Sequence, residues 1–385
     1  MVFLLIGLYE IFNEKSDDGF NNSDSNVIVD TLTQEVLTFP DSLVFETAEK
    51  LVSILKLTNK RHDFHGSVLV AKSGKIIFNQ EYGYANFKKK SKITSEMSFQ
   101  LASVSKQLTA AAVLMLYEDS LIALDDTITK YIPELPYNKI TIRQLLNHTS
   151  GLPMYFWLAE HEWNKEKAPL NYEMLNLMEE FNLPLFFYPG SMFDYSNTGY
   201  FVLASLVERV SGLSYGEYLE SNIFSPLGME NSFVYRFGED SKKENQLVGY
   251  RIHRGWRHIA IPGTVNDGVV GDKNVYSTTI DMFKWINGLN SGKILSKENV
   301  ELMYTKGKTR YGRSVPYGFG FRVSNKNSEK IIYHFGKWNG FSTAIKQYPN
   351  DDDLLIIVLE HSSYNSVNSL VKRIRTIVDD NFVYQ

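Results

Sequence analysis

An almost unbroken apolar run from Leu108 to Leu116 constrains the fold of this chain more than any other feature. Thr109 is the one polar residue within it. A helix that is apolar on every side has no face for water and is therefore buried. We predict a helix in the protein interior. Ser103 and Lys106 precede the run, at the expected first turn, and should also lie inside the protein.

Ser103 and Lys106 have the spacing of a nucleophile and its base. Residues three apart on a helix share a face, so the Lys106 ammonium can reach the Ser103 hydroxyl. Burial penalises the charged form of lysine, and a neutral amine could take the serine proton. The Ser103 N–H, at a helix N-terminus, could face an oxyanion. The alternative is an ordinary N-cap serine followed by a solvated lysine.

The S-x-x-K pattern occurs twice more, as Ser53/Lys56 and Ser369/Lys372. In both segments apolar residues recur at helical spacing on the opposite face. These two pairs are therefore predicted to be exposed to solvent. Periodicity thus leaves Ser103 as the candidate nucleophile.

A second motif, Tyr195-Ser196-Asn197, follows a Pro-Gly-Ser turn signal and precedes the apolar helical segment Phe201–Val210. A loop at this place could present the Tyr195 phenol as a proton shuttle. The Asn197 amide could hold Lys106 or a substrate carbonyl. The alternative is a half-buried tyrosine followed by an asparagine that caps the next helix.

Together with a third motif on a predicted strand, these elements resemble the motif series of the serine β-lactamase-like, penicillin-recognising hydrolases of the class C type. That family includes class C β-lactamases, D-Ala-D-Ala carboxypeptidases, D-aminopeptidases and related esterases. The resemblance covers roughly residues 42–380. The segments that carry it are Ser103-x-x-Lys106, Thr141–Pro153, Tyr195-x-Asn197, Phe224–Met229, Tyr276–Thr278, Tyr317–Gly320 and His334-x-Gly336.

The resemblance implies a serine hydrolase that works through an acyl-enzyme on ester, D-amino-acid peptide or β-lactam carbonyls. By the family pattern Ser103 attacks, and Lys106 and Tyr195 move protons. Asn197 positions the substrate. No metal or organic cofactor is required, and the partner is a small-molecule or peptide substrate. A penicillin-binding sensor or pseudoenzyme that acylates without turnover is the alternative.

The opposite wall of the implied site is His334-Phe335-Gly336, where typical class C β-lactamases carry Lys-Thr-Gly. By the family pattern, the backbone N–H of Lys337 is a second oxyanion donor. Histidine is a less reliable cation than lysine, and Phe335 lacks the threonine hydroxyl. The side chain of Lys337 could supply the missing cation or be an ordinary loop charge. This departure favours an esterase or D-peptidase over an efficient β-lactamase.

Other candidate sites fit their motifs poorly. The Gly212-x-Ser214-x-Gly216 pattern follows a helix, whereas a nucleophile elbow needs a strand before it. We therefore expect Gly212 to be the C-terminal cap of that helix and Ser214 to be the N-cap of the next one. His148 is expected to be structural, because the polar groups of its loop need partners. Asp272 and Asp281 are expected to be loop and cap residues rather than ligands.

The composition agrees with an enzyme built around one large core. The chain has 385 residues, 43% of them hydrophobic, enough for a single bilobed unit. A net charge of −4 gives no electrostatic case for binding nucleic acid. Without cysteine there are no disulfides or thiolate metal sites.

Residues 1–40 are predicted to lie outside this unit. Val2 to Phe12 is apolar but too short to span a bilayer, and Asn13 to Asn26 is polar and linker-like. An apolar tip before a linker favours export to the cell envelope or periplasm, with possible association of the tip with a membrane. A cytoplasmic location is the alternative.

The predicted fold class is α+β and β-lactamase/transpeptidase-like: an antiparallel sheet flanked by terminal helices, with an inserted helical lobe. The α/β lobe should comprise about 41–102 and 310–385, and the helical lobe about 103–309. The expected terminal helices span about 42–58 and 364–380. The expected strands are Ser67–Ala71, Ile76–Glu81, Ile331–Phe335, Phe341–Tyr348 and Leu354–Leu359.

Overall fold

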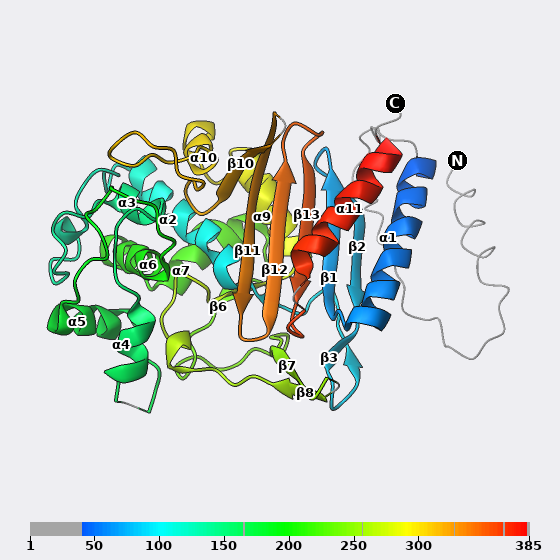
Figure 1. The fold of residues 1–385 in the computed structure, drawn as a ribbon, viewed down its shortest axis with the longest axis horizontal. Coiled ribbons are helices and arrows are strands. Elements are labelled where there is room, and N and C mark those ends of the chain that lie inside the picture. The colour runs from blue at the N-terminus through cyan, green and yellow to red at the C-terminus, as the bar shows by residue number, and fades with distance from the viewer. Residues whose placement is uncertain (1–40, 165, 256, 327, 365, 383–385) are drawn as a thin grey trace.

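The main sheet of this computed structural model has six strands, and every neighbouring pair is antiparallel (Figure 1). The structure describes residues 41–382 except 165, 256, 327 and 365, so the expectations for 1–40 lie outside the described residues. In spatial order the strands are β10 (Arg322–Lys326), β11 (Glu329–Trp338), β12 (Phe341–Tyr348), β13 (Leu354–Glu360), β1 (Gly66–Lys72) and β2 (Lys75–Tyr82).

The two terminal helices, α1 (Asp41–His62) and α11 (Val367–Phe382), lie side by side on one face of this sheet (Figure 1). Their apolar stripes, which include Leu51, Leu55 and Ile374, are buried against the sheet. This arrangement confirms the predicted flanking helices, because the 3.6-residue periodicity of both segments has a buried partner. The Ser and Lys of both outlying S-x-x-K pairs are exposed on these helices, as predicted.

The opposite face of the sheet and its β10 edge adjoin the helical lobe (Figure 1). Its central helix is α2, in which every residue from Lys106 to Leu114 is buried, as the apolar run predicts. The remaining helices are α3 (Ile142–Leu146), α4 (Tyr155–His161), α5 (Asn171–Phe181), α6 (Asn197–Ser211), α7 (Tyr215–Leu219), α8 (Ser225–Leu227), α9 (Thr279–Asn290) and α10 (Lys297–Met303), with α2 spanning Lys106–Glu118.

The helix α9 lies within the range assigned to the helical lobe, yet it packs against β1 and β13 of the sheet. The remaining elements are short. Single turns of 3₁₀ or π type are η1 (Ala102–Ser105), η2 (Ile128–Lys130), η3 (Glu220–Phe224) and η4 (Val265–Asp267). The small strands are β3 (Tyr84–Asn86), β4 (Ser91–Lys92), β5 (Phe99–Gln100), β6 (Phe233–Val234), β7 (Tyr250–His253), β8 (Arg257–Ala260) and β9 (Val275–Ser277).

Two local predictions from the Gly212-x-Ser214 segment are confirmed. Gly212 ends α6 with a φ of 73°, and the Ser214 side chain caps α7 by accepting a hydrogen bond from the Glu217 N–H. Ser214 is therefore a helix cap. Within 41–382, no helix of the described residues is long and apolar enough to cross a bilayer.

Candidate active site

Ser103 lies in the tight turn η1, immediately before α2 begins at Lys106. The preceding residue, Ala102, has a φ of 49°, in the left-handed region that a residue with a Cβ rarely adopts. This backbone is held from two sides: Leu101 donates its N–H to the Val275 oxygen at 2.8 Å, and its own oxygen accepts from the Thr343 hydroxyl at 2.7 Å. The sequence predicted the first turn of an α-helix here, whereas the structure has a separate, strained turn.

Gly336 allows β11 to lie directly against η1. A Cβ at this position would meet the Leu101 oxygen and the Thr343 hydroxyl oxygen, both at 2.3 Å. Distances below about 3 Å between such atoms require one of them to move, and here the nearest atom belongs to the backbone. Gly336 therefore brings the strand that carries His334 beside the turn that carries Ser103.

The Lys106 amine is fully buried and has three oxygen neighbours. Its Nζ lies 2.8 Å from Asn197 Oδ1, 2.8 Å from the main-chain oxygen of Asp272 and 3.2 Å from Ser103 Oγ. A neutral amine has two hydrogens and one lone pair. The amide and carbonyl oxygens can only accept, so they take the two hydrogens, and the lone pair faces the Ser103 O–H.

Burial favours that neutral form. Desolvation lowers the pKa of Lys106 to about 7, opposed by the charge of Asp272 and reinforced by that of Arg322. At pH 7 a substantial share of Lys106 is therefore uncharged. The structure thus brings Ser103, Lys106 and Asn197 together with the polarity that proton abstraction needs.

Tyr195 lies beside this pair with its hydroxyl buried. Lys106 Nζ is 5.1 Å from the centre of the Tyr195 ring. Among the described residues, Tyr195 Oη has no hydrogen-bond partner of good geometry. Burial raises the pKa of Tyr195 far above its usual value, although Ser103 and Arg322 act in the other direction. The phenol is therefore neutral, which suits a proton relay and not a resident base.

The loop that carries Tyr195 is held by His148 and by its own serine. His148 Nδ1 accepts the Ser196 N–H at 3.1 Å, and its ring packs 4.3 Å from the Tyr195 ring, centre to centre. Ser196 caps α6 by accepting the Gly199 N–H. Asn197 is therefore not the helix cap, and its amide is available to Lys106. His148 has the structural place that the sequence predicted.

His334 lines the same cleft but is held as a neutral ring. Its Nδ1 lies 2.8 Å from the Phe335 oxygen and its Nε2 lies 2.9 Å from the Tyr317 hydroxyl. The carbonyl can only accept, so Nδ1 carries the proton and Nε2 accepts from Tyr317. Burial, together with the nearby charges of Lys106 and Arg322, holds the pKa of His334 well below its usual value. His334 is therefore not the cation of this site.

A residue that the sequence analysis missed supplies a cation. Arg322, on the edge strand β10, lies 5.1 Å from the Tyr195 ring centre, and no carboxylate of the described residues lies within ion-pair distance of it. Its signal in the sequence was its position two residues after the Tyr317–Gly320 segment. The cleft has a volume of about 430 Å³ and is lined by Ser103, Tyr195, Arg322, Tyr333, His334, Phe335 and Lys337.

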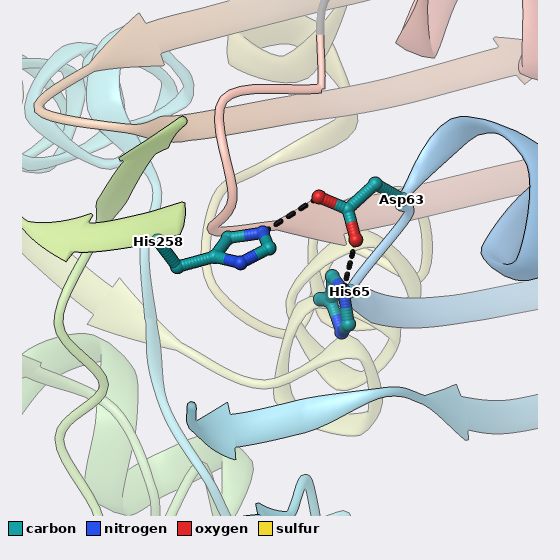
Figure 2. Close-up of side chains that lie close together, drawn as sticks. All are labelled: Asp63, His65 and His258. Carbon is teal, nitrogen blue, oxygen red and sulfur yellow. Dashed lines mark hydrogen bonds and ion pairs between the residues drawn. The ribbon is translucent and has the colours of Figure 1, made fainter. Parts of the chain in front are cut away.

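A separate group of ligand-type side chains lies between the end of α1 and the β7–β8 hairpin (Figure 2). Asp63 Oδ1 is 2.8 Å from His65 Nε2, and Asp63 Oδ2 is 2.6 Å from His258 Nε2. The Tyr84 N–H donates to His65 Nδ1 at 2.9 Å, so in neutral His65 the proton sits on Nε2 and is donated to Asp63. A metal ion needs an unprotonated ring nitrogen. Because both ring nitrogens of His65 are already in hydrogen bonds, these contacts fit a link between two segments better than a metal site.

The sequence comparisons agree with this arrangement of residues. A family model described as Beta-lactamase matches residues 53–377. This chain belongs to the beta-lactamase family. Within it, Penicillin-binding protein 4* of Bacillus subtilis (strain 168) is 31% identical over 316 residues, which cover 80% of this chain and 70% of that protein.

Solved structures of beta-lactamase-like proteins share the fold. The octameric penicillin-binding protein homologue from Pyrococcus abyssi has a TM-score of 0.74 at 26% identity and covers 86% of this chain and 77% of its own. D-amino acid amidase from Ochrobactrum anthropi SV3 has a TM-score of 0.70 at 22% identity, and the match covers 88% of this chain and 98% of the amidase. At this identity the likeness concerns the fold alone. The family resemblance and the β-lactamase/transpeptidase-like fold inferred from the motifs are thus confirmed.

Proposed function

We propose that this protein is a serine hydrolase that forms an acyl-enzyme on Ser103. The observation that carries the proposal is the hydrogen bonding of Lys106. Two acceptor oxygens, from Asn197 and Asp272, take the hydrogens of the neutral amine, and the third neighbour is the Ser103 hydroxyl at 3.2 Å. This geometry activates a serine without histidine as the base.

In the proposed reaction, Ser103 Oγ forms a bond to the substrate carbonyl carbon while its proton passes to Lys106 Nζ. The negative charge that develops on the carbonyl oxygen is stabilised by the N–H of Ser103 and that of Lys337. The Tyr195 hydroxyl relays the proton to the leaving group as its bond to carbon breaks. Water then attacks the ester on Ser103, the same groups move its proton, and the acid product leaves with the serine restored.

The walls of the cleft support a substrate that carries a carboxylate. Arg322 is permanently charged and Lys337 also lines the cleft, whereas His334 is neutral. The sequence of residues 334–337 alone predicts weak binding of a substrate carboxylate. Arg322, which lies outside that segment, adds a cation to the cleft. Phe335 makes the wall more apolar than threonine would. The cations favour esters and D-residue peptides with a nearby carboxylate, and the replacement of the threonine hydroxyl by the Phe335 ring is what disfavours β-lactams among carboxylate-bearing substrates.

A panel of substrates tests this proposal. The full chain is incubated with p-nitrophenyl esters, D-alanyl peptides and a chromogenic cephalosporin, and intact mass is recorded during turnover. We expect turnover of the first two classes with a transient acyl group on Ser103. Stoichiometric acylation without turnover would instead support a penicillin-binding sensor, and cephalosporin hydrolysis with kcat/KM above about 10⁶ M⁻¹s⁻¹ would make the protein a β-lactamase.

A further inference from the structure

A buried ion pair adjoins the Lys106 amine. Asp272, whose main-chain oxygen accepts from Lys106 at 2.8 Å, has a fully buried carboxylate. Its Oδ1 and Oδ2 lie 3.2 and 3.3 Å from Lys273 Nζ. The Tyr155 hydroxyl donates to Oδ2 at 3.2 Å and itself accepts from Lys273. Two adjacent residues of opposite charge thus point into the protein together.

Lys273 is buried, and aromatic rings surround its ammonium group. Its side chain is 3% exposed. Its Nζ lies 5.2 Å from the ring centres of both Tyr155 and Phe156 and 5.1 Å from that of Trp338. Burial lowers the pKa of Lys273, and the carboxylates of Asp272 and Asp267 oppose that shift. Three aromatic faces around the ammonium also stabilise its charge. Burying two charges is costly, so this pair is weak evidence for added stability and calls for another explanation.

That explanation lies in the balance of charge around the base. Among the described residues, Asp272 supplies the one carboxylate charge that acts appreciably on Lys106. In a low-dielectric interior, an unbalanced carboxylate would hold the amine as an ammonium, which cannot accept a proton. The other titratable or charged groups that face Lys106 are neutral phenols, neutral imidazoles or a cation, namely Tyr195, Tyr200, His148, His334 and Arg322.

We propose that Lys273 is a positioning residue that keeps Lys106 available as a base, by neutralising the Asp272 carboxylate while the Asp272 main chain holds the amine. The proposal rests on the proposed serine hydrolase function and assigns Lys273 no contact with substrate. It explains why two opposite charges lie together in the interior beside the catalytic lysine. The proposal predicts that the pH dependence of acylation shifts in opposite directions when Lys273 and Asp272 are replaced separately. A merely structural role would not produce opposite shifts.

The test is the pH dependence of Ser103 acylation by p-nitrophenyl acetate, measured on the full chain. Lys273→Met removes the balancing cation, so the acidic limb of the profile should move up by about one pH unit. Asp272→Asn leaves Lys273 unbalanced and should move the limb down. With both substitutions in one protein, the limb should return close to its wild-type position.

The matched control is Lys284→Met, which removes the 3.4 Å contact between Lys284 and Asp281 on α9, where the lysine side chain is 38% exposed. Its limb should not move. If Lys273→Met does not fold, as judged by thermal unfolding, Asp272→Asn should still move the limb down and the double variant should still restore it. The inference alone is overturned if the limbs of Lys273→Met and Asp272→Asn coincide with wild type or shift in the same direction, or if the limb of the double variant stays where that of Asp272→Asn lies. Absence of any Ser103 acylation in the wild type overturns the proposed function with it.

Discussion

Lys106 Nζ lies 3.2 Å from Ser103 Oγ, and burial lowers the pKa of this amine to about 7. Below that pKa the amine is protonated and cannot accept the serine proton, so kcat/KM should fall about tenfold per pH unit. Above it the rate should level off. Hydrolysis of p-nitrophenyl acetate from about pH 5 to about pH 9 measures this profile. A flat profile across neutral pH would show that another group is the base.

Lys106→Arg is the matched variant for that profile. Arginine keeps the positive charge but cannot be deprotonated in a protein. We expect a loss of at least about 100-fold in kcat at every pH, the usual contribution of a general base. If more than about a tenth of kcat remained, a loss below about 1.4 kcal/mol in barrier, Lys106 would contribute charge only.

Tyr195→Phe should separate activity from stability. The Tyr195 hydroxyl is buried without a partner among the described residues, so its removal leaves no acceptor or donor unsatisfied. The free energy of unfolding should therefore stay the same or rise slightly. The rate of acyl transfer should fall by about 100-fold or more, because the relay to the leaving group is lost. Unchanged kcat in a folded Tyr195→Phe protein would remove the relay role.

Arg322→Gln should act on substrates according to their charge. Because Arg322 lines the cleft and has no carboxylate partner among the described residues, its charge is available to the substrate. For a D-alanyl peptide with a free carboxylate, kcat/KM should fall by about 10-fold to 100-fold, and for its neutral amide it should change little. Equal losses on both substrates would mean that Arg322 acts through Tyr195 or the fold instead.

Gly336→Ala should disturb the contact between β11 and η1. The new Cβ would lie 2.3 Å from the Leu101 oxygen, so β11 and η1 must separate. We expect a loss of about 1–3 kcal/mol in the free energy of unfolding, with reduced acylation of Ser103. Gly216→Ala is the control, because its Cβ would meet only Val234 at 3.5 Å. Denaturant unfolding of the two variants measures the difference, and equal stabilities would contradict the packing argument.

The sequence predicted those parts of the fold whose signal is local. Helical periodicity identified both terminal helices, and the run after Lys106 identified the buried helix α2. Strand Phe341–Tyr348 has the predicted bounds, because its limits are set by a turn signal on either side. β10 escaped prediction, since its sequence, Arg-Val-Ser-Asn-Lys, has no apolar alternation.

The site was predicted as far as its motifs extend. What escaped prediction depends on tertiary contacts: the Tyr317 hydroxyl that keeps His334 neutral, and the burial of Asp272 beside Lys273. Adjacent opposite charges in a sequence usually mark solvent-exposed loops, and only the folded chain shows this pair facing Lys106. Asp272 was expected to be a loop residue, and its main-chain oxygen does lie in a loop, yet this oxygen accepts a hydrogen bond from the Lys106 amine.

Intact mass after reaction with a fluorophosphonate tests the assignment of Ser103 most directly. The wild type should gain one covalent adduct, and so should Ser53→Ala, Ser214→Ala and Ser369→Ala, whose serines are exposed or cap a helix. Ser103→Ala should gain none. An adduct on folded Ser103→Ala, at the wild-type rate, would show that another residue is the nucleophile.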